Sequence, residues 1–327
     1  RDEMKYVLLA NEVGVKGDIG KTFYNFYYKI RDTRMDYKYR NDISRIENFA
    51  GVNLRFGNDS LSYIEAYGEY ELKGNYRIGG RIDITWFHAE AESQQSAPTY
   101  MQEAFRGSFN EWNNDFSSPI TTHFSGGFDF DWNKFSLKPG AGYSLHSNYI
   151  YFERFINSEG FYDILPFQTQ GDISVLYGEV DFSLTFLKRM NLTSRFRWSN
   201  VSGSSAQAIR LPELDSLTQL SYNNLIFNGN LDLHTGIDFH WRSDYYAMGY
   251  DPAVTQYHIQ DEFESYGYPL IDIFINARVN RGRLFLKLNN VMELLQDRGY
   301  FAAPYYPGQA TVLDFGIDWI FLSLIHI

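Results

Sequence analysis

The sequence of 327 residues contains no cysteine, and this absence removes several classes of protein at once. A disulfide scaffold, an iron–sulfur cluster and a zinc site built on thiolates all require cysteine. No run of 18 or more apolar residues occurs either, so the sequence predicts no transmembrane helix. Basic residues are outnumbered, and the net charge of −11 argues against a general nucleic-acid-binding protein.

Aromatic residues, in contrast, are abundant in this acidic chain. It carries 26 Tyr, 27 Phe and 6 Trp, while its mean hydropathy is only −0.37. So many rings argue against disorder, because disordered chains are poor in aromatic residues. A polar average combined with many rings leaves two main interpretations: a large soluble β protein, or an outer-membrane β-barrel.

The dominant pattern along the chain is an alternation of apolar and polar residues with period 2, which indicates half-buried strands. No convincing helical period appears, and the best short candidate is Val291 to Leu295. The alternating windows with the clearest pattern are 76–86, 124–132, 231–242, 271–279 and 313–321. Weaker windows are 22–30, 50–56, 135–146, 174–187 and 192–199.

Strand length and loop length favour the membrane interpretation. A soluble strand has about 5–6 residues, whereas a transmembrane barrel strand needs roughly 9–11. Short turns are expected near 57–60, 73–75, 133–134, 188–189, 229–230 and 281–282, and long loops near 93–99, 157–170, 202–219, 243–267 and 296–310. Short turns at one end and long loops at the other are typical of outer-membrane barrels. We therefore predict an all-β, antiparallel transmembrane meander barrel with about 14–16 strands visible, incomplete if N-terminal strands are missing.

In such a barrel, lipid-facing and lumen-facing side chains alternate, so the charged positions of each strand are expected to point inward. The predicted lumen-lining residues are Arg81, Asp83, Arg195, Arg197, Asp232, His234, Asp238, His240, Asp272, Arg278, Lys287, Asp314 and Asp318. Tryptophans near strand ends, on the apolar face, suit the headgroup zone of a membrane. The predicted aromatic girdle consists of Trp86, Trp132, Trp198, Trp241 and Trp319.

The two ends of the chain lead to separate expectations. No signal-peptide pattern precedes the first strand-like run, so we expect residues 1–321 to be the C-terminal part of a longer chain forming one barrel domain. Phe321 closes an alternating strand and is the predicted signal for the barrel-assembly machinery. Residues 322–327 break the alternation, and we interpret this tail as a cloning or sequencing artefact.

Several segments resemble the putative porin family of Bacteroidota. The resemblance is carried by residues 225–239, 245–253, 268–276, 299–307 and the closing run 315–321, and it is strongest over about residues 220–321. It implies a barrel fold and an outer-membrane location more firmly than it implies any transported solute.

Motifs that would carry chemistry fail on inspection. The segment 14–22 looks like a phosphate loop, but Val15 stands where its first glycine is required. Residues 129–140 resemble a calcium loop, yet Lys134 and Gly140 replace the required Gly and Glu. His234 and His240 share a strand face about 20 Å apart, too far for one metal ion. The sequence therefore predicts no metal site and no cofactor.

Catalysis is likewise not expected. Asp314 and Asp318 form a carboxylate pair, and Asp238, His240 and Ser243 are neighbours, but no nucleophile elbow surrounds the serine. Tyrosine-rich loop segments at 245–246, 266–268 and 305–306 could stack on sugars or contact a partner, or simply pack on one another.

The leading functional prediction is a porin-like channel for passive diffusion of small hydrophilic solutes, in the bacterial outer membrane. One alternative is a non-conducting barrel component of a secretion or TonB-dependent uptake complex, and another is a soluble β-rich carbohydrate-binding protein. Expected partners are outer-membrane lipid, the barrel-assembly machinery, small hydrophilic solutes and other outer-membrane proteins, but not nucleic acid.

Overall fold

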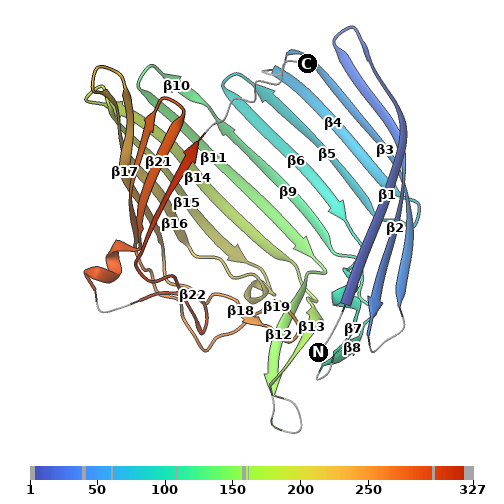
Figure 1. Cartoon of the computed structure of the whole chain (residues 1–327). Coiled ribbons are helices and arrows are strands. Elements are labelled where there is room, and N and C mark those ends of the chain that lie inside the picture. The colour runs from blue at the N-terminus through green and yellow to red at the C-terminus, as the bar shows by residue number, and fades with distance from the viewer. Residues whose placement is uncertain are drawn as a thin grey trace, which may run out of the picture.

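A computed structural model describes residues 4–38, 42–59, 62–107, 110–156, 160, 162–296 and 299–319. Within them, fifteen antiparallel strands follow one another as a meander in a single curled sheet (Figure 1). The strands are β1 Met4–Ile19, β2 Thr22–Tyr37, β3 Ile43–Asp59, β4 Ser62–Glu71, β5 Tyr76–Ile84, β6 Phe87–Gln95, β9 Ile120–Phe128, β11 Phe135–Ser147, β14 Ile173–Phe186, β15 Met190–Ser202, β16 Leu214–Ile226, β17 Leu231–Arg242, β20 Leu270–Val279, β21 Gly282–Asn289 and β24 Val312–Trp319. The predicted fold class and strand number are therefore confirmed.

Most alternating windows coincide with strands of this sheet. The window 231–242 has the same bounds as β17, which pairs with β16 on one side and β20 on the other. The window 124–132 is broken at Asp129, because β9 ends at Phe128 and the short strand β10 (Phe130–Trp132) pairs with β11 only. The window 76–86 is too long by two residues, since β5 ends at Ile84 and a turn follows.

Five strands of the main sheet lie outside the alternating windows: β1, β4, β6, β16 and β21. In β6 the face that begins with Phe87 continues with alanine, serine and glutamine, so hydropathy hardly alternates. The start of β16 at Leu214 also shortens the loop expected over 202–219. Hydrogen bonds to neighbouring strands determine these segments, because backbone pairing does not require a hydropathy contrast.

The connections differ between the two ends of the sheet. Tight turns at 20–21, 85–86, 133–134, 187–189, 227–230 and 280–281 lie at the upper end in Figure 1, and long connections lie at the lower end. One expected turn is at the other end: residues 72–75 join β4 to β5 among the long loops. The predicted asymmetry holds, with that exception.

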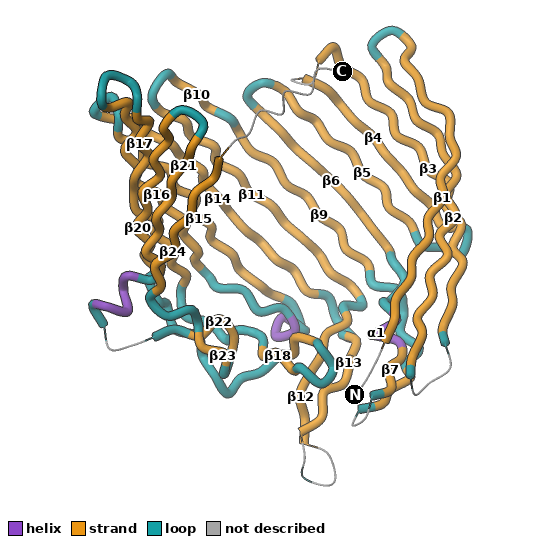
Figure 2. Tube along the Cα trace, viewed as in Figure 1, coloured by secondary structure: helices purple, strands orange, loops and turns teal. Residues whose placement is uncertain are grey.

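The long connections carry secondary structure of their own, and Figure 2 shows them gathered at one end of the sheet. We call the segments 96–119, 148–172, 203–213, 243–269 and 290–311 the loop cap. It contains α1 Tyr100–Glu103, β7 Ala104–Arg106, β8 Glu111–Asn113, β12 Ile150–Ile156, β13 Tyr162–Gln168, η1 Ala206–Ala208, β18 Gly249–Asp251, β19 Gln256–His258, η2 Val291–Leu294, β22 Phe301–Ala303 and β23 Tyr306–Pro307. The 3₁₀ turn η2 falls within 291–295, the best short helical candidate in the sequence.

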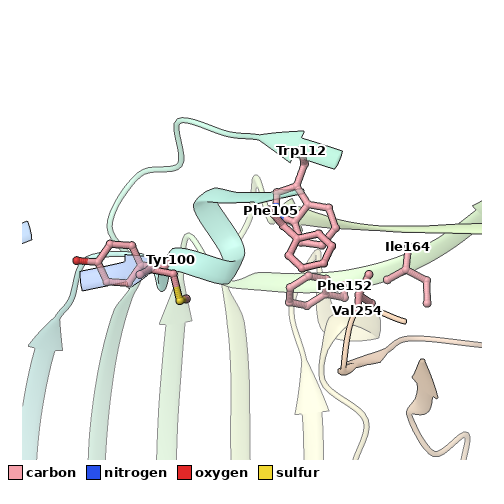
Figure 3. Close-up of a cluster of buried hydrophobic side chains, with 7 residues drawn as sticks. Tyr100, Phe105, Trp112, Phe152, Ile164 and Val254 are labelled. Atoms are coloured by element: carbon pink, nitrogen blue, oxygen red, sulfur yellow. The ribbon is translucent and has the colours of Figure 1, made fainter. Parts of the chain in front are cut away.

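The main cluster of buried apolar side chains lies in the loop cap. Phe105 stacks on Trp112 with ring centroids 4.7 Å apart, and Trp112 meets Phe152 edge-on at 6.0 Å (Figure 3). The cluster comprises Met35, Tyr100, Phe105, Trp112, Phe152, Ile164 and Val254. Because these residues come from three loops and β2, they join separate connections into one packed unit.

The main sheet is open. Among the described residues β1 pairs only with β2 and β24 only with β21, so both edges retain unpaired backbone groups. The described residues therefore form an open sheet that does not close into a barrel. Residues 320–327, which include the predicted assembly signal Phe321 and the tail 322–327, lie outside the described residues.

Candidate functional site

One face of the sheet carries nearly all of its charged side chains, and we call it the polar face. Strand alternation and cross-strand register place all thirteen predicted lumen-lining residues on it. They come from β5, β15, β17, β20, β21 and β24, which are well separated in sequence. The structure therefore assembles one continuous charged surface from them.

Charges on β14 and β15 form a ladder across the strand pair. Arg195 lies directly opposite Asp181 and donates to it at 2.7 Å, while Arg197 lies opposite Glu179 and donates at 2.6 Å. All four side chains are about a third exposed or more, so each pair contributes little to stability. Their main consequence is a fixed arrangement of opposite charges on the polar face.

A second cluster lies where β17, β20 and β21 meet. Asp238 and Asp272 are directly opposed, an unfavourable pairing of like charges. The Nζ atom of Lys287 lies 2.8 Å from Asp272 and 3.8 Å from Asp238, so it offsets their repulsion. Asp314 is the register partner of Lys287 on β24 and accepts a hydrogen bond from Asn289 at 2.7 Å. Three carboxylates thus surround one ammonium group.

The remaining predicted lumen residues are held in local contacts. Arg278 pairs with Asp232 at 2.8 Å, and Arg81 pairs with Asp83 at 2.7 Å. His240 Nε2 lies 3.1 Å from Asp215. His234 and His240 have different partners, as their predicted separation requires. His234 packs edge-on against Phe274 on β20. Asp318 lies in register with Arg283.

A further network on β2 to β6 is absent from the sequence-based prediction. Lys29 and Tyr27 of β2 both donate to Glu69 of β4, at 2.5 and 2.8 Å. Tyr67 of β4 donates to Glu92 of β6 at 2.5 Å. The odd-numbered Tyr and Glu residues of β4 were a usable signal, since they alternate with Ile, Ala and Gly.

Contacts between side chains of alternate strands show toward which face the sheet curves. Tyr27 reaches Glu69 across β3, Tyr67 reaches Glu92 across β5, and Lys287 reaches Asp238 across β20. Side chains from alternate strands meet only where they converge, which happens on the concave side of a curved sheet. The polar face is therefore the inner face of the curl.

The opposite, convex face is apolar and carries all five tryptophans of the predicted girdle. Trp132 pairs across the strands with Phe135, and Trp319 with Gly282, both at the short-turn end. Trp86 lies in a turn at the same end and stacks on Phe128 at 6.1 Å. Trp198 and Trp241, opposite Leu214 and Ser216, lie near the loop cap. The five rings thus form two groups, one at each end of the apolar face.

Part of the loop cap packs on the polar face itself. Both carboxylate oxygens of Glu103 accept from Arg45 Nη2 of β3, at 2.7 and 2.6 Å, and the Arg45 guanidinium lies 4.9 Å from the ring centre of Tyr100. Between this segment and the sheet lies a cavity of about 400 Å³. Its lining includes the buried carboxylates Glu47 and Glu71. Segment 96–103 therefore narrows the space enclosed by the curled sheet.

The described part of the chain contains neither a cluster of metal ligands nor a helix that could cross a membrane. No group of three or more His, Asp or Glu side chains is placed to hold a metal ion there. Helices long and apolar enough to cross a membrane are also absent from those residues.

The fold is similar to that of several solved transport proteins. A copper transporter, OprC, superposes with a TM-score of 0.71 at 12% identity, covering 97% of this chain and 56% of its own. The FrpB iron transporter from Neisseria meningitidis gives 0.65 at 10% identity, covering 97% and 55%. The siderophore receptor PirA from Acinetobacter baumannii gives 0.68 at 9% identity, with the same coverage. The chain thus spans just over half the length of these structures, and the likeness concerns the fold alone.

Comparison with protein families is more specific than these fold similarities. No curated protein matches the sequence. The sequence profile of one family, described as Putative porin, matches residues 1–323. The resemblance seen in the sequence is strongest over residues 220–321, and the family match extends well upstream of that region. The family description, together with the barrel-like fold, supports a β-barrel protein of channel type. The chain belongs to the Putative porin family.

Proposed function

We propose that the chain forms the wall of an outer-membrane channel that admits small hydrophilic solutes by passive diffusion. The observation that carries the proposal is the division of one curled sheet into a concave charged face and a convex apolar face. In a membrane, only a closed sheet satisfies every backbone polar group, and its outer face must be apolar. The thirteen predicted lumen-lining residues would then border water.

Dimensions of the strands support a membrane-spanning wall. The twelve residues of β17 extend about 40 Å along the strand, which a tilt of about 40° reduces to roughly 30 Å across the membrane. This matches the hydrocarbon thickness of a bilayer. The two groups of tryptophans at the ends of the apolar face would then lie at the two headgroup zones.

Closure of the barrel requires further strands. Open edges at β1 and β24 would leave backbone groups without partners in lipid. We infer that residues 1–321 belong to one barrel domain of a longer chain whose other strands join these edges. Outer-membrane lipid and the barrel-assembly machinery would be its partners, with Phe321 as the assembly signal.

The arrangement of charges suggests a modest preference for cations. The two arginines on β15 are matched one to one by carboxylates on β14, whereas Lys287 lies among Asp238, Asp272 and Asp314. A wall with surplus negative charge raises the local concentration of cations.

A second candidate is a barrel component of an uptake complex. It is favoured by the likeness to a copper transporter, an iron transporter and a siderophore receptor, each nearly twice as long as the matched region. The loop cap, which packs on the polar face, would then control access, and the barrel alone would not conduct.

Conductance in planar bilayers tests the channel. We expect the full-length protein, including the strands that join β1 and β24, to migrate heat-modifiably on gels after refolding in detergent and to give stepwise conductance, with reversal potentials in a KCl gradient favouring K⁺. Replacing Asp238 and Asp314 with Asn should reduce that preference, whereas Asp163→Asn in the cap should not. Folded protein that gives no conductance steps would reject passive diffusion and favour the uptake component. Solubility without detergent would reject both and favour the soluble β-rich carbohydrate-binding alternative.

A further inference from the structure

Two long connections of the loop cap, 243–269 and 290–311, meet through aromatic rings. Tyr250 contacts Tyr257 at 5.1 Å and Tyr306 at 6.0 Å. Phe263 contacts Phe301 at 4.8 Å and Tyr305 at 5.6 Å. We call Tyr250, Tyr257, Phe263, Phe301, Tyr305 and Tyr306 the aromatic patch; β18, β22 and β23, which carry several of these residues, lie close together in Figure 2.

Four of the six side chains in this patch are exposed. Tyr305 is 62% exposed, Tyr257 57%, Tyr306 41% and Phe301 37%, whereas Tyr250 and Phe263 are half-buried and Trp112 in the buried cluster is 5% exposed. An aromatic side chain contributes to folding mainly by leaving water, so the exposed rings contribute little to stability. Folding therefore does not explain why so many rings gather at this surface.

The backbone at Tyr305 is a second, independent observation. This residue has a φ of +67° at the turn between β22 and β23, directly after Pro304. Glycine or asparagine normally occupies such a position after proline, because a side chain is strained in the left-handed region. Tyrosine here costs about 1 kcal/mol or more. A strained residue with an exposed ring points to a role for the ring outside the fold.

Polar groups border the rings. Tyr305 Oη lies 3.4 Å from Glu262, whose carboxylate is paired with Arg154, and the neighbouring Asp261 is paired with Arg210 at 2.6 Å. A small notch of about 30 Å³ beside the patch is lined by Tyr266, Tyr300, Phe301 and Ser265 among others. The hydroxyl of Ser265 is buried there without a hydrogen-bond partner in the described structure.

We propose that the aromatic patch is a binding site for neutral oligosaccharides. Flat tyrosine rings can stack on the C–H faces of sugar rings, while phenol hydroxyls and carboxylates exchange hydrogen bonds with sugar hydroxyls. Anionic glycans are disfavoured by the carboxylates at the rim and by the net charge of −11. Cationic ligands lack an unpaired partner in Glu262 and Asp261, because both already pair with arginines. On the proposed channel, the site would concentrate sugars at the entrance.

Titration calorimetry on detergent-folded protein tests the proposal. The probes are maltohexaose, cellohexaose, mannohexaose and xylohexaose, with polygalacturonate as the anionic comparison. Tyr305→Asn should preserve or raise the thermal midpoint, because it relieves the strained turn, and should weaken binding of the sugar that binds best about five- to tenfold. Tyr257→Ala should weaken it similarly. Tyr162→Ala is the matched control, since Tyr162 is 60% exposed on β13, outside the patch.

The proposal is overturned if no neutral probe binds in the millimolar range or tighter. It is also overturned if polygalacturonate binds better, or if Tyr162→Ala weakens binding as much as Tyr257→Ala does. Conductance of the same preparations is measured separately. A conducting protein without sugar binding would reject this site alone, and sugar binding without conductance would reject the channel alone.

Discussion

At the scale of single residues, hydrogen bonds on the polar face are made by tyrosines whose rings lie over glycines of the neighbouring strand. Tyr67 of β4 is the register partner of Gly79 of β5, and its ring covers that glycine while its hydroxyl reaches Glu92 of β6. Tyr27, Gly51 and Glu69 repeat this arrangement on β2, β3 and β4. The absent side chain of the glycine makes room for the ring, so these glycines are required by close approach rather than by a turn.

Gly79→Ala should therefore destabilise the sheet. A Cβ at residue 79 would lie 2.6 Å from Cζ and Oη of Tyr67, which forces the ring to move and weakens its bond to Glu92. We expect a loss of about 1–3 kcal/mol in the free energy of unfolding, measured by urea titration of tryptophan fluorescence. The control is Gly68→Ala on β4, where a Cβ meets no atom closer than 3.9 Å. Equal losses for both variants would refute this role of the ring.

Lys287 separates two like charges on the polar face. The variant Lys287→Met leaves Asp238 and Asp272 opposed without a cation, and we expect it to lower the free energy of unfolding by about 1 kcal/mol. Asp238→Asn in the same background should recover most of that loss, because it removes one of the two repelling charges. A double-mutant cycle in urea measures the coupling between residues 238 and 287, and a coupling of zero would contradict the assignment.

At the scale of elements, the loop cap is held together by contacts between connections. Ile259 donates its backbone N–H to the carbonyl of Phe152 at 2.9 Å, which joins segment 243–269 to β12. Arg154 on the same strand pairs with Glu262. Tyr268 donates to Asn290 at 2.7 Å and stacks on Tyr300 at 5.1 Å, which joins 243–269 to 290–311. Asp261 also pairs with Arg210 of segment 203–213. Segment 243–269 thus contacts three of the other cap segments directly, and the cap is expected to open as a unit.

Low pH should weaken the contact between segment 243–269 and β12, which includes the pair Arg154–Glu262. The hydrogen bond from Arg154 lowers the pKa of Glu262 below its ordinary value of 4.5. A carboxyl group with a lowered pKa contributes stability above that ordinary value and loses the contribution as pH falls through the lowered pKa. Hydrogen exchange at the Ile259 amide, corrected for intrinsic rates, should therefore speed up below about pH 4.5. Glu262→Gln should abolish this pH dependence, and amides of β17 serve as the internal control. An unchanged response in Glu262→Gln would assign the effect to another group.

At the scale of the whole molecule, the position of the tryptophans distinguishes the membrane from water. Variants that retain one tryptophan each can be folded into bilayers containing brominated lipids, which quench nearby indoles. We expect Trp86, Trp132, Trp198, Trp241 and Trp319 to be quenched most by bromine near the headgroups. Trp112, buried in the loop cap, should be quenched little and is the matched control. Strong quenching of Trp112 with weak quenching of the other five would invert the proposed orientation.

The sequence predicted much of this architecture because most of the long strands alternate apolar and polar residues with period 2. The window 231–242 and β17 coincide. Twelve of the thirteen predicted lumen-lining positions come from such windows, and all thirteen fall on one face. The pattern failed where hydropathy did not alternate, as in β6, and where a break left the alternation intact, as at Asp129. Bends and breaks depend on neighbouring strands, which a one-dimensional pattern does not contain.

By itself, the sequence determined the fold class, the long strands and the two faces, because these follow from local alternation and strand length. Only the tertiary structure decided which charges meet. Glu69 joins residues of β2, Lys287 lies among three carboxylates from three strands, and Glu262 pairs with a strand more than a hundred residues upstream. Such pairs depend on register and curvature, which arise when strands distant in sequence are hydrogen-bonded side by side. The aromatic patch likewise exists only because two long connections fold against each other.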